Sequence, residues 1–163
     1  MTLRRGPLFL ALALAAIARA EEPKGQSVEY PAGYRQWAHV KSMVIYSEKH
    51  PLHAQFGGFH HIYANADAMR AYTKGGTFPD GSIIVFDLLE ARDENGAWVA
   101  GERKLIGVMR KDRARFKTTG GWGFEGFKRD SRSERMVTDP AGQCFSCHQQ
   151  QKDNDFVFSG YRP

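Results

Sequence analysis

The chain has 163 residues and a formal net charge of +5, and its length fits one domain with a sizeable core. It contains no internal repeat and no low-complexity tract. Three of its arginines fall within the first 20 residues, and without them the formal charge drops to about +2. Such a small positive excess does not indicate a nucleic-acid partner.

The first 20 residues have the pattern of a secretory signal peptide. Two arginines precede an apolar run that extends to Ile17, and a small-x-small cleavage signal ends at Ala20. The run is too short for a membrane span, although an uncleaved anchor is the alternative. We therefore expect residues 1–20 to be cleaved after Ala20, giving a periplasmic product without a membrane attachment. Residues 21–29 are polar and predict a loose N-terminal arm.

Residues 30–163 predict a single domain. An Asn95-Gly96 pair predicts a hairpin turn, and residues 66–74 predict a helix with Asn65 as its N-cap. Residues 47–58 are expected to form a loop. Shorter helices are expected over residues 34–37 and 112–117. Strands are predicted over residues 39–46, 59–63, 82–89, 98–99 continued by 104–110, and 122–127. The sum is a mainly β (α+β) fold, an antiparallel sheet of about five strands with a few short helices.

The residues Cys144-Phe145-Ser146-Cys147-His148 spell C-x-x-C-H, the attachment motif of a c-type haem. Each thiol can form a thioether to a haem vinyl group. His148 follows the second thiol directly, which carries its ring under the iron as the axial ligand. The motif therefore predicts one covalently attached haem c, held by Cys144, Cys147 and His148 on a C-terminal helix.

Three other interpretations of the two cysteines are weaker. A structural zinc site needs four ligands, and no second cysteine pair exists. A thioredoxin-like pair lies near the start of a βαβ domain, whereas here only a short tail follows the motif. A structural disulfide across two residues would constrain the unfolded chain very little.

Besides the haem motif, several segments spread over most of the mature chain follow a recognisable order: Tyr34-Arg35-Gln36-Trp37, His61-Ile62-Tyr63-Ala64-Asn65, Phe78-Pro79-Asp80-Gly81, Lys111-Asp112, Gly121-Trp122-Gly123-Phe124 and Asp155-Phe156-Val157-Phe158. This ordered set resembles the β-sheet c-haem proteins that include cytochrome P-460 and cytochrome c′-beta. The resemblance implies a homodimer whose five-coordinate haem has an open distal side.

The chain departs from the hydroxylamine-oxidising P-460 members at one position. Those members carry a lysine cross-linked to the porphyrin, five residues past the glycine of the Asp-Gly turn. Here that position is Phe86, and no lysine lies between Lys74 and Lys104. The chain therefore resembles the c′-beta branch better. Those proteins bind nitric oxide on an aromatic distal face, and carbon monoxide is a second expected ligand.

Phe86 and Phe56 are the expected aromatic residues of the distal pocket. The resemblance also places His60 where the P-460 members carry a pocket arginine. His60 and His61 are neighbours on a predicted strand, so only one of them can face the haem. Asp155 and Glu125 are candidate acids behind His148, whose second ring nitrogen is expected to donate to a carbonyl or a carboxylate.

Three functions remain open from the sequence. The leading one is gas binding without turnover. The second is an oxidoreductase, either by hydroxylamine oxidation or by peroxidase chemistry assisted by His60. The third is electron transfer to an unidentified redox partner, which would follow if an internal side chain filled the sixth iron position. The candidates for that position are Met43, Met69, Met109, Met136, His39, His50 and His53.

Overall fold

The structure is a computed structural model and describes residues 27–163. The predicted signal peptide and the first part of the predicted arm lie outside the described residues. Val28 is 1% exposed, and its carbonyl accepts a hydrogen bond from Arg135. The prediction of a loose arm up to residue 29 is therefore wrong at its C-terminal end, because an apolar side chain there packs into the core.

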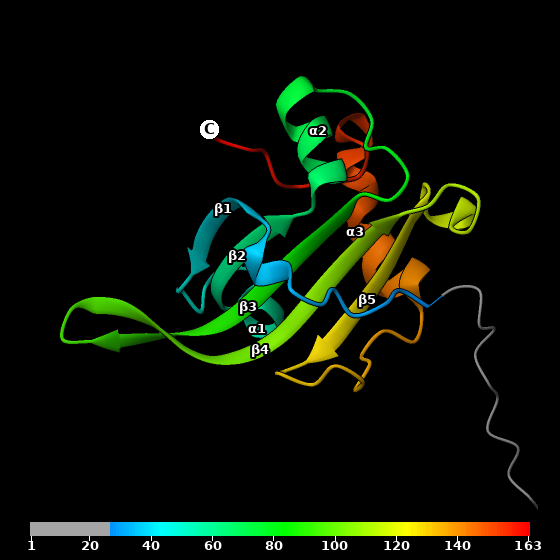
Figure 1. The fold of residues 1–163 in the computed structure, drawn as a ribbon. Coiled ribbons are helices and arrows are strands. Elements are labelled where there is room, and N and C mark those ends of the chain that lie inside the picture. The colour runs from blue at the N-terminus through cyan, green and yellow to red at the C-terminus, as the bar shows by residue number, and fades with distance from the viewer. Residues whose placement is uncertain (1–26) are drawn as a thin grey trace, which may run out of the picture.

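Five strands form one antiparallel sheet, in which each strand pairs with the next strand in the chain (Figure 1). This arrangement confirms the predicted fold class. The strands are β1 (Ala38–Ile45), β2 (Gly58–Ala64), β3 (Ile83–Glu94), β4 (Ala97–Lys111) and β5 (Trp122–Lys128).

The hairpin between β3 and β4 is longer than the sequence predicts. The strands remain paired out to Glu94 and Ala97, and the hairpin projects from the body of the molecule (Figure 1). Asn95 and Gly96 both have positive φ angles, 56° and 84°, as the predicted tight turn requires. The added residues are largely charged and exposed, so backbone pairing alone extends these strands, and a hydrophobic pattern does not detect it.

The helices are short. Helix α2 (Ala66–Lys74) has the predicted bounds, and Asn65 Oδ1 accepts a hydrogen bond from Ala68 N at 3.0 Å. Helix α1 (His53–Phe56) lies inside a segment predicted to be a loop. None of the helices within residues 27–163 is long and apolar enough to cross a membrane. The other helical segments are 3₁₀ helices over Tyr34–Gln36, Lys117–Thr119 and Gln149–Asn154, a π-helix over Ala141–Phe145 and α3 over Ser146–His148.

Each face of the sheet carries its own hydrophobic core. The face that we call the α3 face presents side chains such as Ile84 and Phe124 to α2, to Phe145 and to the C-terminal segment. The opposite face, which we call the N-terminal face, presents Val85 and Ile106 to the segment that begins at Val28. In Figure 1 α3 lies behind the sheet and the blue N-terminal segment crosses in front of it.

Candidate functional site

The haem motif lies in a helical segment that is capped locally. Gln143 Oε1 accepts hydrogen bonds from the backbone N–H groups of Thr138 and Asp139, at 2.8 and 2.7 Å. The first turn is a π-helix, a rare form that is frequent at functional sites. Cys144 is half-buried and Cys147 is exposed, and both thiols are free. Burial raises the pKa of the Cys144 thiol to about 11, and the nearby charge of Glu125 contributes a smaller part of this rise.

His148 is held in one tautomer by the backbone. Its Nδ1 lies 2.7 Å from the carbonyl oxygen of Phe156, which can only accept, so Nδ1 carries the proton. The other nitrogen, Nε2, is then left with a lone pair, the form in which imidazole binds a metal. Burial lowers the pKa of His148 and favours this neutral state. The ring is packed between Phe124 and Phe158, with centroid distances of 4.9 and 5.1 Å.

The acceptor behind His148 is therefore a carbonyl, one of the two kinds expected from the sequence. Neither candidate acid fills this role directly. Asp155 precedes the accepting residue, but its carboxylate binds Lys111 Nζ at 2.7 Å and the N–H of Phe78 at 2.9 Å.

Glu125 is bound at a different place. It follows Phe124 on β5, and its carboxylate pairs with Arg135 Nη1 at 2.5 Å. The same carboxylate accepts from the N–H groups of Gly126 and Val137, at 2.9 and 3.3 Å. Its expected role next to His148 is not supported by these contacts.

The three predicted distal residues do lie together. The Phe86 ring is 4.8 Å from the His60 ring and 5.9 Å from the Phe56 ring, between centroids. His60 is 9% exposed, and its Nε2 lies 2.5 Å from the Phe56 carbonyl oxygen. Burial lowers the pKa of His60, while the hydrogen bond to Phe56 opposes that shift. Phe56 comes from α1, outside the strands, and still reaches the other two, which the sequence analysis had grouped with it.

Register decides which of the two neighbouring histidines shares a face with the motif. His60 pairs with Leu88 of β3, two residues from Phe86 and therefore on the same face. Ile84 of the α3 face lies two residues further along the same strand. His61 points to the N-terminal face, where its Nδ1 lies 2.7 Å from Ser42 Oγ.

Two glycines lie in one row beside Phe86 on the α3 face. Phe86 pairs with Gly107 of β4, and Gly107 pairs with Gly126 of β5. A Cβ atom at Gly107 would lie 3.2 Å from the Phe86 ring, which is tighter than ordinary contact. A Cβ atom at Gly126 would lie 3.5 Å from Met136 and 3.7 Å from Val137, so neighbouring side chains lie over both glycines.

The other predicted iron ligands are used elsewhere or stand apart. Met69 and Met109 pack against the core of the α3 face, and Met43 and Met136 are 45% and 42% exposed. His39 Nε2 lies 2.8 Å from Ser42 Oγ. His50 Nδ1 accepts from the N–H of Leu52 at 3.2 Å. Among residues 27–163 no group of three or more His, Cys, Asp or Glu side chains is placed to hold a metal ion.

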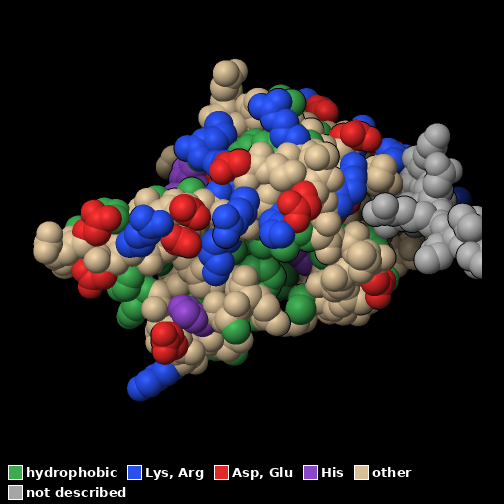
Figure 2. All heavy atoms as spheres, turned by 90° about the horizontal axis from the view of Figure 1, so that it is seen from below, with side chains coloured by type: hydrophobic (Ala, Val, Ile, Leu, Met, Phe, Trp, Pro, Cys, Tyr) green, Lys and Arg blue, Asp and Glu red, His purple; other side chains and the backbone are tan. Residues whose placement is uncertain are grey.

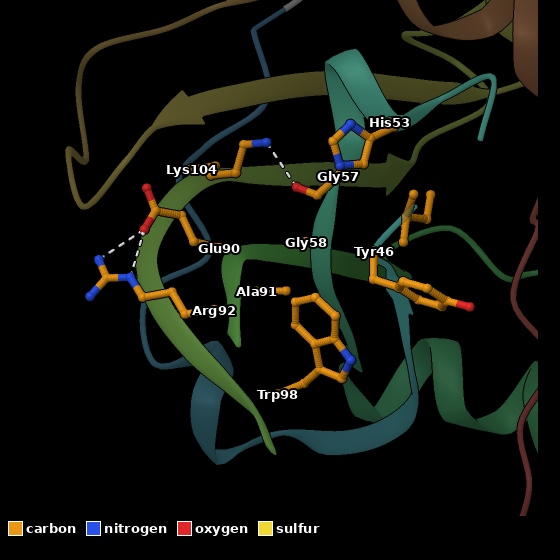
Figure 3. Close-up of a pocket in the computed structure, with 10 residues that line it drawn as sticks. Tyr46, His53, Gly57, Gly58, Glu90, Ala91, Arg92, Trp98 and Lys104 are labelled. Atoms are coloured by element: carbon orange, nitrogen blue, oxygen red, sulfur yellow. Dashed lines mark hydrogen bonds and ion pairs between the residues drawn. The ribbon is translucent and has the colours of Figure 1, made fainter. Parts of the chain in front are cut away.

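A cavity of about 270 Å³ lies at the base of the projecting hairpin and does not include the haem motif. Figure 3 shows Tyr46 and Trp98 on one side of it and Glu90, Arg92 and Lys104 on the other. The Lys104 ammonium donates to the Gly57 carbonyl at 2.8 Å. His53, one of the candidates for the sixth iron position, also lines this separate cavity.

The residues of the site fit a c-type haem. Two free thiols and an imidazole with an available Nε2 come from one short helical segment. Phe158, which contacts His148, is 54% exposed, a large apolar surface that a bound porphyrin would cover. Seen from below, hydrophobic side chains gather in a recessed area between charged ones (Figure 2). Fold and site together define a c-haem protein built on an antiparallel sheet.

Comparison with known families agrees with this class. The family model described as Cytochrome P460 matches residues 31–159, so the chain belongs to the Cytochrome P460 family. No curated protein matches the chain. Family membership makes the protein a mono-haem cytochrome with covalently attached haem c.

Proposed function

We propose that this cytochrome is of the c′-beta kind and binds nitric oxide, or carbon monoxide, at a five-coordinate haem. In this proposal Cys144 and Cys147 form the two thioethers and His148 Nε2 is the axial ligand. Haem iron held on one side by an imidazole offers its other side to a diatomic gas. The observation that carries the proposal is the cluster of Phe56, His60 and Phe86 on the α3 face.

The hydrogen bond from His60 favours gas binding over peroxidase chemistry. A carbonyl cannot donate, so His60 Nε2 must carry the proton that it gives to Phe56. Burial lowers the pKa of His60, so the ring is neutral and its Nδ1 has no proton. While this bond is in place, His60 offers neither a hydrogen bond nor a proton to a ligand on the iron. Such a pocket suits a neutral gas better than a peroxide.

Aromatic side chains complete the pocket. Phe86 and Phe56 are apolar and would exclude water from the open iron position. Nitric oxide and carbon monoxide need no hydrogen-bond donor, whereas a polar distal group is needed to stabilise a bound oxygen species. The pocket therefore selects by excluding water.

Hydroxylamine oxidation is the alternative function. Phe86 argues against it, because this residue stands at the position of the cross-linked lysine of the P-460 members. Strand β3 contains no lysine, so it cannot supply the cross-link of the P-460 members. On the neighbouring strand β4, Lys104 is also not available for this role. It donates to the Gly57 carbonyl beside the separate cavity.

The test uses the purified haem protein and two variants, Phe86→Ala and His60→Leu. We expect a high-spin ferric spectrum and rapid binding of nitric oxide to the reduced protein, without turnover of hydroxylamine or peroxide. Phe86→Ala should admit water to the ferric iron, whereas His60→Leu should leave gas binding largely intact. A low-spin spectrum with an internal ligand, or turnover abolished by His60→Leu, would contradict the proposal.

Two further parts of the proposal rest on the sequence and the resemblance. The N-terminal pattern supports export to the periplasm, which N-terminal sequencing of the secreted protein tests: a mature chain should begin at Glu21. The resemblance supports a homodimer, which sedimentation of the haem protein tests. A chain that retains its first 20 residues, or a monomer, would contradict the corresponding part.

A further inference from the structure

The residue that accepts the His148 hydrogen bond lies in an unusual backbone turn. Asp155 and Phe156 both have left-handed φ angles, 48° and 67°. Aspartate tolerates this conformation, but a bulky aromatic residue rarely adopts it. Such strain persists only where the surroundings over-determine the backbone, and it concentrates at functional sites.

Asp155 is fixed through three of its oxygens, each by a different element. Its Oδ1 binds Lys111 Nζ at 2.7 Å, and its Oδ2 accepts from Phe78 N at 2.9 Å. Its carbonyl oxygen accepts from Trp122 Nε1 at 2.8 Å. Strands β4 and β5 and the chain before β3 therefore all hold one residue in place, which leaves the following peptide little freedom.

Phe156 is fixed as tightly. Its N–H donates to the Gln151 carbonyl at 2.7 Å, and its ring packs on the Phe145 ring at 5.1 Å. The other side of the ring lies against Gly120, where a Cβ atom would come within 2.4 Å of it. The peptide that carries the Phe156 carbonyl is held as well, because the N–H of Val157 donates to the Asn154 carbonyl at 3.0 Å, and the Phe156 carbonyl accepts from His148 Nδ1.

Lys111 is the charged group behind this arrangement. Its side chain is 2% exposed, lies over the Trp122 ring and also donates to the Gly120 carbonyl at 3.1 Å. A lysine is almost never fully buried unless it is paired. A hydrophobic residue of similar size would fill the same space without needing a partner, so packing alone does not account for Lys111.

We propose that Lys111 and Asp155 are positioning residues for His148. Their ion pair holds the strained turn that aims the Phe156 carbonyl at Nδ1, and this hydrogen bond sets the basicity of Nε2 and so the strength of its bond to iron. The proposal rests on the role of His148 in the proposed function. It adds a contact between residues 44 positions apart in the chain.

The experiment uses the intact haem protein and a double variant, Lys111→Met with Asp155→Asn, in which both buried charges are removed together. Asparagine keeps an acceptor for Phe78 and tolerates a left-handed φ, so the double variant should fold even if Lys111→Met alone does not. The measurements are the iron–histidine stretching frequency of the reduced protein by resonance Raman and the midpoint potential.

We expect the double variant to show a lower stretching frequency and a more positive potential, because a looser Phe156 carbonyl leaves the imidazole a weaker donor. Asp87→Asn is the matched control: Asp87 is a fully buried carboxylate of the N-terminal face, paired with Arg103. That variant should lose stability while keeping the wild-type stretching frequency.

Two results overturn the proposal and can be told apart. If the double variant is less stable but keeps the wild-type stretching frequency, Lys111 and Asp155 are structural only, and the proposed function stands. If the unmodified protein shows no iron–histidine band, its reduced haem is not five-coordinate through His148, and the proposed function fails together with this inference, which rests on it.

Discussion

On the N-terminal face the fully buried carboxylate of Asp87 receives hydrogen bonds from Tyr34, Arg35 and Arg103. On the α3 face the buried ammonium of Lys111 meets one carboxylate, that of Asp155. The first network joins the sheet to the N-terminal segment. The second leads through one peptide to His148. Buried charges on the two faces therefore have different consequences: one stabilises the fold, and the other also reaches the site.

Apolar surface is divided between the faces in a similar way. The aromatic side chains of the N-terminal face are largely covered, for example Tyr34 and Phe127 at 4% and 0% exposure. Next to the haem motif, Phe158 remains 54% exposed. Apolar surface is therefore open beside His148, where a cofactor can cover it, and also at the base of the hairpin, where Tyr46 and Trp98 are 62% and 46% exposed.

Of the changes that distinguish the two faces, removal of the two thiols should have the largest effect. In Cys144→Ala with Cys147→Ala we expect complete loss of covalently bound pigment, because no other cysteine exists in the chain. Haem staining after denaturing electrophoresis measures this. Asp87→Asn, made in parallel, should keep its pigment, and stain retained by the cysteine variant would contradict covalent attachment.

Breaking the network of the N-terminal face should cost the most stability among single changes. Asp87→Ala removes a fully buried carboxylate and leaves the Arg103 charge without its main partner, which costs about 3–5 kcal/mol of unfolding free energy. Urea unfolding at neutral pH measures it.

The matched control acts on the same guanidinium. Asp130 also pairs with Arg103 but is 76% exposed, so Asp130→Ala should cost about 0–1 kcal/mol. Equal losses in the two variants would show that burial does not make the difference.

A smaller effect is expected at the N-terminus of α2, which covers the α3 face. Asn65 Oδ1 accepts from the N–H groups of Ala68 and Ile83, so Asn65→Ala should cost about 1–2 kcal/mol in thermal or urea unfolding. Thr73→Ala in the same helix is the control and should be close to neutral, because its exposed hydroxyl only bonds back to the helix. A neutral Asn65→Ala would mean that the cap is not needed.

The smallest effect is a dependence of stability on pH. Burial lowers the pKa of both His60 and His61, one on each face. The unfolded chain takes up protons below about pH 6.5 while the folded chain resists them, so the unfolding free energy should fall as pH drops through that value. His60→Leu should flatten this fall in urea unfolding at pH 7.5 and 5.5. His61→Gln should also flatten the fall. If both variants keep the wild-type dependence on pH, burial of these two histidines is not its cause.

The sequence by itself determined what depends on neighbouring residues. The haem motif is five consecutive residues, the Asn65 cap acts within one helical turn, and the Asn95-Gly96 turn follows from two residues that accept positive φ. Alternating strands gave the fold class, since side-chain direction repeats every two residues. The resemblance to the P-460 proteins singled out Phe86, at the position where those proteins carry their cross-linked lysine.

Only the tertiary structure decided what depends on register and on the backbone. Strand pairing placed His60, and not His61, on the face of the motif. The acceptor for His148 is a carbonyl, a group that every residue carries and that no sequence pattern marks. The partner of Lys111 lies 44 residues away, and the sequence marked Lys111 only by its charge directly after a predicted strand and by its place in a segment that resembles the family. Such long-range contacts are fixed by how the elements pack. A local sequence pattern does not specify them, because many sequences can bring two such groups together.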